Sequence, residues 1–209
     1  SYLEGELGLD IEQSYKNIKP FDWEVIFPDI FKHGGFDSVI GNPPYSAKQS
    51  TDNTYLTKYY RTVEYKCDLF AFFLERGINL LKKDGKLGYI IPVSWLTNFY
   101  YKKLRQYLID SQLIEEINLI NGLVFEQANI DTNIIILSKD ISKSSLKWII
   151  SSAGKLNTQF IERPYSQFKA SEGYAIGSVT DDAWFSLKDK IDLQSIELKK
   201  IAKISLGMK

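Results

Sequence analysis

The stretch that decides the fold is Phe36-Asp37-Ser38-Val39-Ile40-Gly41-Asn42-Pro43-Pro44-Tyr45. Its first half is a short apolar run of strand length, which ends abruptly at a glycine. Each proline fixes its own φ and lacks an N–H, and each keeps the preceding residue out of the helical region. The sequence therefore predicts a strand over residues 36–40 that runs into a stiff loop. This loop carries one amide and one aromatic ring.

The loop suits methyl transfer to a planar amino nitrogen. The side-chain oxygen of Asn42 and the carbonyl of Pro43 can each accept one hydrogen of an exocyclic –NH₂ group. This localises the nitrogen lone pair for attack on an electrophilic methyl group. No strong general base is needed, which suits a chain whose only histidine is His33. Tyr45 offers a stacking face worth roughly 1–3 kcal/mol. The alternative is an ordinary turn after a strand, because Asn-Pro and Pro-Pro are common loop signals.

Composition indicates one globular core. The chain has 209 residues, of which 44% are hydrophobic, and this is ample for one core but marginal for two domains. Lysine plus arginine and aspartate plus glutamate both number 26, so any DNA contact has to come from a local basic patch. The single Cys67 cannot form an internal disulfide, which favours a reducing, cytoplasmic compartment. No apolar run is long enough to predict a membrane span. Because residue 1 is Ser, we expect a piece of a longer polypeptide.

Predicted helices and strands alternate along the rest of the chain. Apolar periodicity predicts helices over residues 64–83 and 97–110. Apolar runs predict strands at 87–92, 114–120, 132–137 and 144–152, whereas 21–28 reads as a short aromatic strand or loop and 180–203 as a helical linker. This alternation indicates an α/β architecture.

The quoted loop resembles motif IV of amino-methyltransferases, and the order of later segments is similar to the gamma-class adenine-N6 DNA methyltransferases of restriction-modification systems. The similar segments are Cys67–Glu75 (motif V), Gly85–Pro92 with Ser94–Leu96 (motif VI) and Leu123–Glu126 with Asp131–Ile136 (motif VIII and the last strand). The resemblance covers about residues 20–209, and its order and spacing are more specific than any later motif alone.

This resemblance implies a partial Rossmann-like fold of the class I S-adenosylmethionine-dependent methyltransferases. The family's strand order is 3-2-1-4-5-7-6, and this chain would hold strands 4, 5, 7 and 6. Residues 1–150 would be the C-terminal half of the catalytic domain, and 151–209 a linker with the start of a target-recognition domain. The strand at 36–40 would keep an unpaired edge, which predicts possible self-association.

The resemblance also implies residue roles. Asn42, Pro43, Pro44 and Tyr45 would be catalytic, and Phe125 would contact the flipped base together with Tyr45. Asn42 would also touch S-adenosylmethionine, whose adenine pocket would be lined by Leu69 and Phe73. The alternative for Phe125, Leu69 and Phe73 is ordinary core packing.

Two expectations concern cofactor and DNA. The family's glycine-rich loop for S-adenosylmethionine would lie upstream of Ser1, so the chain alone should bind this cofactor weakly. Lys48, Lys58 and Arg61 could contact DNA phosphates, or could belong to a solvated loop. His33 and Cys67 lack partners spaced for metal binding, so no metal is expected.

The leading functional interpretation is therefore a fragment of an adenine-N6 DNA methyltransferase acting on double-stranded DNA. One alternative is glutamine-N5 methylation of a protein, because a carboxamide –NH₂ makes similar demands. The other is a non-catalytic DNA-binding or interaction module. Glu197-Leu198-Lys199 with Asp192 weakly resembles a nuclease motif, but these residues lie on a predicted amphipathic helix.

Overall fold

The computed structural model describes most of the chain between Phe21 and Gly177 and short pieces beyond it. The described residues are 21–45, 59–62, 67–122, 124, 130–140, 143–177, 187, 190–191, 193–196 and 198–203. The predictions made for Lys48, Lys58 and Phe125 lie outside them, as do those for Asp192 and Glu197. No helix in this described part is long and apolar enough to cross a membrane.

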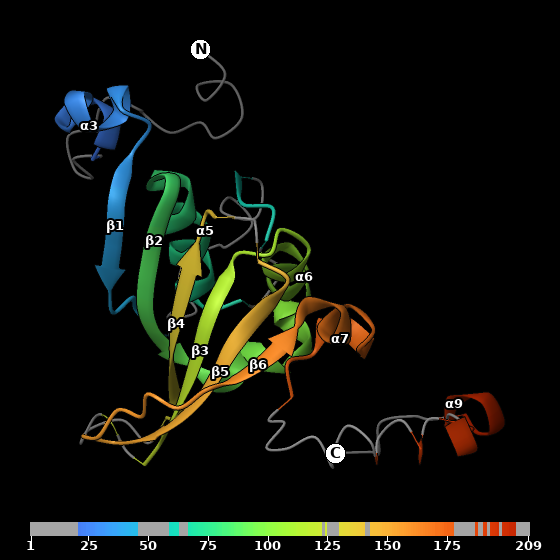
Figure 1. Cartoon of the computed structure of the whole chain (residues 1–209). Coiled ribbons are helices and arrows are strands. Elements are labelled where there is room, and N and C mark those ends of the chain that lie inside the picture. The colour runs from blue at the N-terminus through green and yellow to red at the C-terminus, as the bar shows by residue number, and fades with distance from the viewer. Residues whose placement is uncertain are drawn as a thin grey trace, which may run out of the picture.

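A six-stranded mixed sheet forms the centre of the molecule (Figure 1). Its strands are β1 (Phe36–Gly41), β2 (Leu81–Pro92), β3 (Ile114–Asn121), β4 (Thr132–Ser138), β5 (Ser145–Ser152) and β6 (Ile161–Pro164). The spatial order is β1-β2-β4-β3-β5-β6. The first four positions confirm the predicted neighbours, since β1, β2, β4 and β3 correspond to family strands 4, 5, 7 and 6. β1 is parallel to β2 and β3 to β5, whereas β4 runs antiparallel to both of its neighbours.

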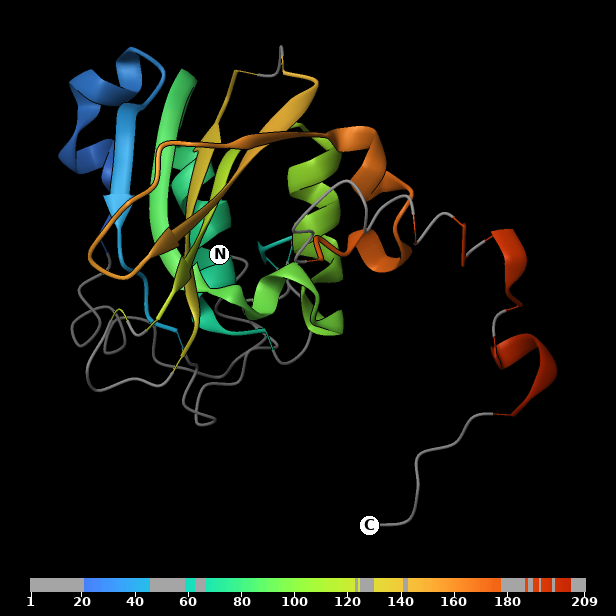
Figure 2. The same ribbon diagram turned by 60° about the horizontal axis from the view of Figure 1, so that its bottom comes forward.

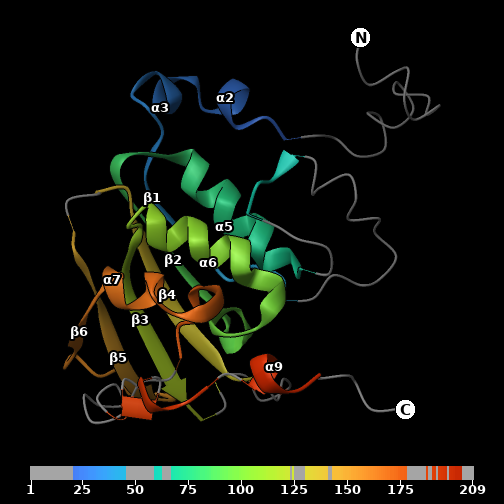
Figure 3. The same cartoon turned by 90° about the vertical axis from the view of Figure 1, so that its right-hand side faces the viewer.

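Helices cover one face of this sheet (Figure 3). The longer ones are α5 (Leu69–Leu80) and α6 (Lys102–Asp110), and α7 (Tyr165–Lys169) lies beside α6. The remaining described helices and turns are short: α2 (Trp23–Ile26), α3 (Pro28–Lys32), η1 (Val93–Leu96), η2 (Phe99–Tyr101), η3 (Glu172–Tyr174) and α9 (Leu198–Ile201).

Helix α5 packs unusually close to β2. Phe70, Leu74 and Ile78 recur every four residues and are buried. Gly77 permits the approach, because a Cβ there would lie 2.4 Å from Leu87 Cδ1. The prediction of a helix to residue 83 was wrong at its end, since Leu81 already begins β2. Gly85, which follows the predicted helix and is of a residue type common at helix ends, lies inside that strand.

Most of the segment 21–28 is helical, in α2 and at the start of α3, so the prediction of a strand was wrong. The carboxylate of Asp22 accepts hydrogen bonds from the backbone N–H groups of Glu24 and Val25 and so caps α2. Pro28 stands in the first turn of α3, where its missing N–H costs nothing. These two terminal signals outweigh the strand preference of the aromatic residues, whose rings pack against Phe36.

The second long helix begins later than predicted. The side chain of Asn98 accepts a hydrogen bond from Tyr100 N and starts the separate turn η2, so α6 begins only at Lys102. Leu104 and Leu108 are buried.

The sheet and its core extend past the boundary predicted at residue 150, which falls inside β5. β6 and α7 were not predicted, because each is only four or five residues long. Tyr165 is buried and its hydroxyl donates to the carbonyl of Ile114 at 2.5 Å, and Ile176 is fully buried. We therefore propose that the catalytic part reaches Gly177 and that a separate unit begins after it.

The predicted helical linker at 180–203 is described only in part. Its last described part forms the short helix α9. Leu187 and Ile191, which lie before this helix, are each about half exposed. The part of this linker that the structure describes adds no residue to the core cluster.

Candidate active site at the carboxyl edge of the sheet

The Asn42–Tyr45 loop leaves the sheet at the carboxyl end of β1, which points to the lower edge in Figure 1. β2 runs parallel beside it, with Gly41 paired to Tyr89, and ends three residues further on at Pro92. The loops after both strands therefore emerge from one edge. In open α/β sheets, ligands bind at this edge.

The loop exposes the amide of Asn42 to solvent, whereas the residue after it is buried. Asn42 and Pro44 are exposed and Pro43 is buried. Tyr45 is half-buried, and this burial raises the pKa of its hydroxyl. Beneath the loop, a Cβ on Gly41 would lie 3.1 Å from the ring of Tyr89, so only glycine fits here without a shift. The backbone on both sides of Asn42 is therefore constrained, and the exposed Asn42 side chain is open to a ligand.

A cavity of about 500 Å³ lies along β1 and beside this loop. Its walls bring Asn42, Pro43 and Pro44 together with Phe73, and the cofactor contacts expected of Asn42 and Phe73 stay predictions. Tyr45, Leu69 and Arg61 are also described by the structure, but they are not among the described residues that line this cavity. The described residues that line it are Trp23, Phe36, Ser38, Val39, Ile40, Gly41, Asn42, Pro43, Pro44, Phe73, Arg76, Gly77, Leu80 and Tyr89. Its volume is within the usual range for small-molecule sites.

This cavity fits part of S-adenosylmethionine. Phe73 is 45% exposed and, with Pro44 and Leu80, offers apolar surface for an adenine ring. No carboxylate lines the described walls, although ribose hydroxyls and the ammonium group would each need an acceptor. Leu69 is half-buried against the core instead of lining the cavity. The described residues could therefore hold the adenine side of the cofactor, and the other contacts need groups that the described walls lack.

The start of α5 is tied to the turn that follows β2. The thiol of Cys67 donates to the carbonyl of Tyr100 at 2.8 Å, and the Tyr101 hydroxyl donates to the Asp68 carboxylate at 2.5 Å. Burial, reinforced by this carboxylate, raises the pKa of Tyr101. The ring of Tyr101 also lies 5.2 Å from that of Phe70. Figure 2, which brings this edge forward, shows η1 and η2 beside the start of α5.

Sequence analysis missed two buried polar residues that hold this edge. Asn133 is fully buried and donates from its amide nitrogen to the carbonyls of Ile91 and Pro92. Its only signal is an amide inside an apolar strand. The second residue is Arg105. Its Nη1 atom donates to the carbonyls of Trp95 and Asn98, each at 2.7 Å. Its Nε and Nη2 atoms donate to the carbonyl of Gly173.

Arg61 lies against the helical layer. Its guanidinium stands 4.7 Å from the centre of the Tyr107 ring and its Nε lies 3.8 Å from Glu75 Oε1. The buried carboxylate of Glu75 also accepts from the backbone N–H of Arg61 and from the hydroxyl of Thr62. The side chain of Arg61 is still 70% exposed, so its contact with phosphate stays a prediction.

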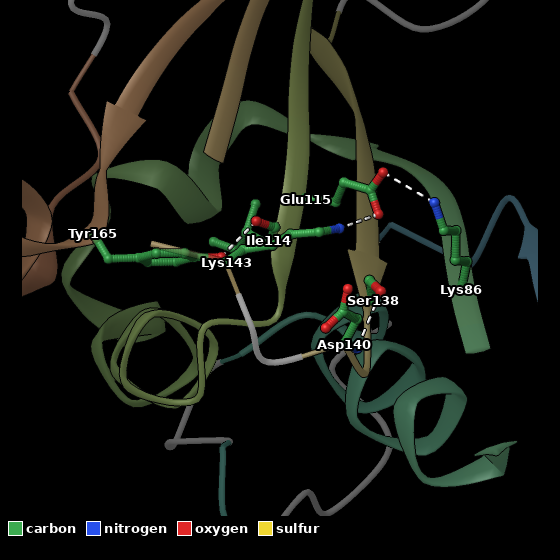
Figure 4. Close-up of polar contacts among 7 residues, drawn as sticks. All are labelled: Lys86, Ile114, Glu115, Ser138, Asp140, Lys143 and Tyr165. Atoms are coloured by element: carbon green, nitrogen blue, oxygen red, sulfur yellow. Dashed lines mark hydrogen bonds and ion pairs between the residues drawn. The ribbon is translucent and has the colours of Figure 1, made fainter. Parts of the chain in front are cut away.

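The opposite, amino edge carries charged pairs. Glu115 accepts from Lys143 Nζ at 2.6 Å and from Lys86 Nζ at 3.0 Å (Figure 4). Burial alone would raise the pKa of Glu115, but the two lysines more than offset this, and the pKa lies below its ordinary value. These contacts join the starts of β2, β3 and β5.

The described residues hold no group of three or more histidine, cysteine, aspartate or glutamate side chains that could bind a metal ion. The one histidine, His33, has its Nδ1 atom 2.7 Å from the carbonyl of Asp29.

The strand order, the helices on one face and the loop at the carboxyl edge define a partial class I S-adenosylmethionine-dependent methyltransferase fold. A methyltransferase subunit of a type I restriction-modification system from Streptococcus thermophilus superposes with a TM-score of 0.51 at 26% identity, over 67% of this chain and 31% of that one. The type IIG restriction endonuclease BpuSI superposes with a TM-score of 0.56 at 18% identity, over 75% of this chain and 22% of that one.

The chain belongs to the Eco57I restriction-modification methylase family, whose model matches residues 3–125. It is 25% identical over 201 residues to the type II restriction enzyme and methyltransferase RM.Eco57I of Escherichia coli. This match covers 92% of this chain and 20% of the relative. It is 37% identical over 132 residues to RM.MjaORFECS2P of Methanocaldococcus jannaschii, provisionally described as the same kind of enzyme. That match covers 63% of this chain and 11% of the relative, so the chain spans a small part of both.

Proposed function

We propose that this chain carries the base-binding part of an adenine-N6 DNA methyltransferase of a restriction-modification system. One observation carries the proposal: the Asn42–Tyr45 loop, with an exposed amide and two fixed prolines, stands at the carboxyl edge of the sheet beside a cavity of about 500 Å³. Membership of the Eco57I restriction-modification methylase family supports the reaction class. The names of the relatives in E. coli and M. jannaschii support the same class.

The loop would act on the amino group of a flipped adenine. The Asn42 side-chain oxygen and the Pro43 carbonyl accept its two hydrogens, so the nitrogen lone pair is no longer delocalised into the ring. S-adenosylmethionine, when bound, supplies the electrophilic methyl group. Tyr45 stacks on the base, and Phe125 contacts it from another side. Because the amino group is paired inside the duplex, the base must first leave the stack, which costs a few kcal/mol and is offset in the pocket.

The backbone of the loop rests on buried residues, so the loop can act without a change of conformation. Pro43 is buried, and Gly41 rests on the ring of Tyr89. Acceptors that are already in place cost no reorganisation when charge develops in the transition state. Polar contacts at Asn133 and Arg105 hold the neighbouring turn in the same way.

Two further proposals concern the cellular location of the enzyme and its association with a second copy. We place the enzyme in the cytoplasm of a bacterial or archaeal cell, where its DNA substrate lies. We also propose self-association through β1, which among the described strands pairs only with β2 and whose Ile40 is 87% exposed. Sedimentation that shows a monomer at every protein concentration would contradict this pairing.

The test of the function is transfer of labelled methyl groups from S-adenosylmethionine by the complete natural polypeptide that contains these residues. Mixed-sequence duplex DNA and a release-factor protein are offered side by side. We expect label as N6-methyladenine in DNA. We expect its loss in Asn42→Ala and its retention in Asn121→Ala, an exposed asparagine at the end of β3 on the same edge. Label only on protein would assign glutamine methylation, and label on neither would leave a non-catalytic module.

A further inference from the structure

A turn next to the proposed site exposes two aromatic rings to solvent, and hydrogen bonds hold its backbone. It comprises residues 98–103, between the end of β2 and the first residues of α6, and is called the aromatic turn below. Phe99 is 74% exposed and Tyr100 is 40% exposed, and their ring centres lie 6.2 Å apart. Lys102 and Lys103 follow directly and are exposed.

The backbone beneath these rings is fixed from three sides. Arg105 Nη1 donates to the carbonyl of Asn98, and the Asn98 side chain accepts from Tyr100 N at 3.0 Å. The thiol of Cys67 donates to the carbonyl of Tyr100. Tyr101 turns inward and is buried with its hydroxyl on Asp68. Phe99 and Tyr100 are therefore presented outward by a turn whose backbone is held by hydrogen bonds.

Charge on the aromatic turn points to an anionic partner. Lys102 and Lys103 occupy the first turn of α6, and this turn contains no acidic residue. The positive end of the helix dipole disfavours cations at such a position. A bound polyanion would offset this repulsion at Lys102, and aromatic rings next to a lysine are the combination that contacts both bases and phosphates in nucleic-acid sites.

The position of the aromatic turn selects the anion. It follows β2 on the edge where the Asn42–Tyr45 loop follows β1, and it is bonded to the start of α5. Double-stranded DNA that delivers a base to this loop therefore has flanking nucleotides close to the same edge. Where a base has left the stack, its neighbours expose apolar faces that an aromatic ring can cover.

We propose that the aromatic turn is a DNA-contacting surface, in which Phe99 and Tyr100 pack on nucleotides flanking the flipped base while Lys102 meets a phosphate. This proposal deepens the function proposed above and takes its partner, duplex DNA, from it. Phe99 and Tyr100 bind and position the DNA, and they take no part in the transfer step.

The experiment uses the complete natural polypeptide and a fluorescent mixed-sequence duplex. The double variant Phe99→Ala, Tyr100→Ala should bind the duplex about tenfold more weakly than wild type, because base stacking on an aromatic ring is lost. The matched control is Phe160→Ala, since this ring is 47% exposed but stands over Lys147 in β5. The control should bind normally. Both variants should keep the wild-type melting temperature, because they remove exposed rings.

A second readout locates the contact. A photo-crosslinking phenylalanine analogue at position 99 should attach to the DNA, and the same analogue at position 160 should not. Lys102→Gln should lower the salt dependence of binding by about one unit in the log–log slope. Equal affinity of the double variant and the control, or crosslinks from position 99 to protein alone, would overturn the proposal.

Failure of this inference can be told apart from failure of the proposed function. Wild-type protein that methylates DNA while the double variant binds with full affinity would overturn the inference alone. Wild-type protein that binds DNA through position 99 but transfers no methyl group would overturn the catalytic proposal alone. Wild-type protein that binds no DNA would overturn both.

Discussion

The two edges of the sheet differ in the charged pairs that they carry. At the amino edge, charged side chains pair with each other, as Glu115 does with Lys86 and Lys143, and the buried Tyr165 hydroxyl donates to the carbonyl of Ile114. At the carboxyl edge, buried polar side chains bond to backbone carbonyls, as Asn133 and Arg105 do, and the side chains left outside face solvent. We infer that the charged pairs of the amino edge contribute to stability. The carboxyl edge keeps its turns rigid so that Asn42 and Phe99 can meet a partner.

The largest expected effect on stability is at the start of β1. Gly35 has φ +122°, and a Cβ there would lie 2.5 Å from the carbonyl oxygen of Leu80, which is backbone and cannot swing away. Gly35→Ala should lower the free energy of unfolding by about 4 kcal/mol in denaturant titration. Gly154→Ala is the control, because it also has positive φ but nothing within 4 Å, and should cost only about 1 kcal/mol. Similar losses in both would contradict the clash. Methyl transfer per folded molecule should not change.

Arg105→Met should break the carboxyl edge. It leaves the carbonyls of Trp95, Asn98 and Gly173 without this donor, and we expect a loss of about 3 kcal/mol in unfolding free energy. Transfer per folded molecule should also fall, because the turn beside the candidate site is released. Gln106→Ala, at the exposed next residue, should change neither quantity. A destabilised variant with a wild-type rate would show that Arg105 stabilises the fold without positioning the site.

Asn133→Leu should have a smaller effect of the same kind. The carbonyls of Ile91 and Pro92 lose one donor, which should lower the free energy of unfolding by about 1–2 kcal/mol. We expect the Michaelis constant for DNA to rise more than the turnover number falls, since the end of β2 carries the aromatic turn and not the reacting groups. Steady-state kinetics would separate the two, and an unchanged Michaelis constant would contradict this role.

These residues also show what the sequence could and could not predict. The strand at β1, its loop and the buried strands were predicted because local apolar runs and prolines determine them. α2 and α3 were missed because one capping aspartate and one proline outweighed aromatic strand preference. Arg105 and Asn133 were missed because their roles depend on carbonyls 68 and 42 residues away. β6 and α7 were missed because they are only four and five residues long and form by packing on β5 and on α6, respectively.

The smallest effect is expected at the amino edge and depends on pH. Glu115→Gln should lower the free energy of unfolding at neutral pH by less than about 1 kcal/mol, since the lysines that it pairs with are partly exposed. The pKa of Glu115 is lowered in the folded protein, so its contribution is present above the ordinary value of 4.5 and is lost as pH falls through the folded value. Denaturant titrations should therefore converge for the two proteins in acid. A difference that grows as pH falls would contradict the sign.

The most direct measurement of the difference between the edges compares Asn42→Ala with Glu115→Gln in the complete natural polypeptide. The rate of methyl transfer to DNA is divided by the folded fraction in each. Loss of one acceptor that acts in the transition state should slow Asn42→Ala by about 10²–10³-fold with an unchanged melting temperature. Glu115→Gln should lower only the melting temperature. Asn42→Ala that keeps a rate within about twofold of wild type would contradict the account.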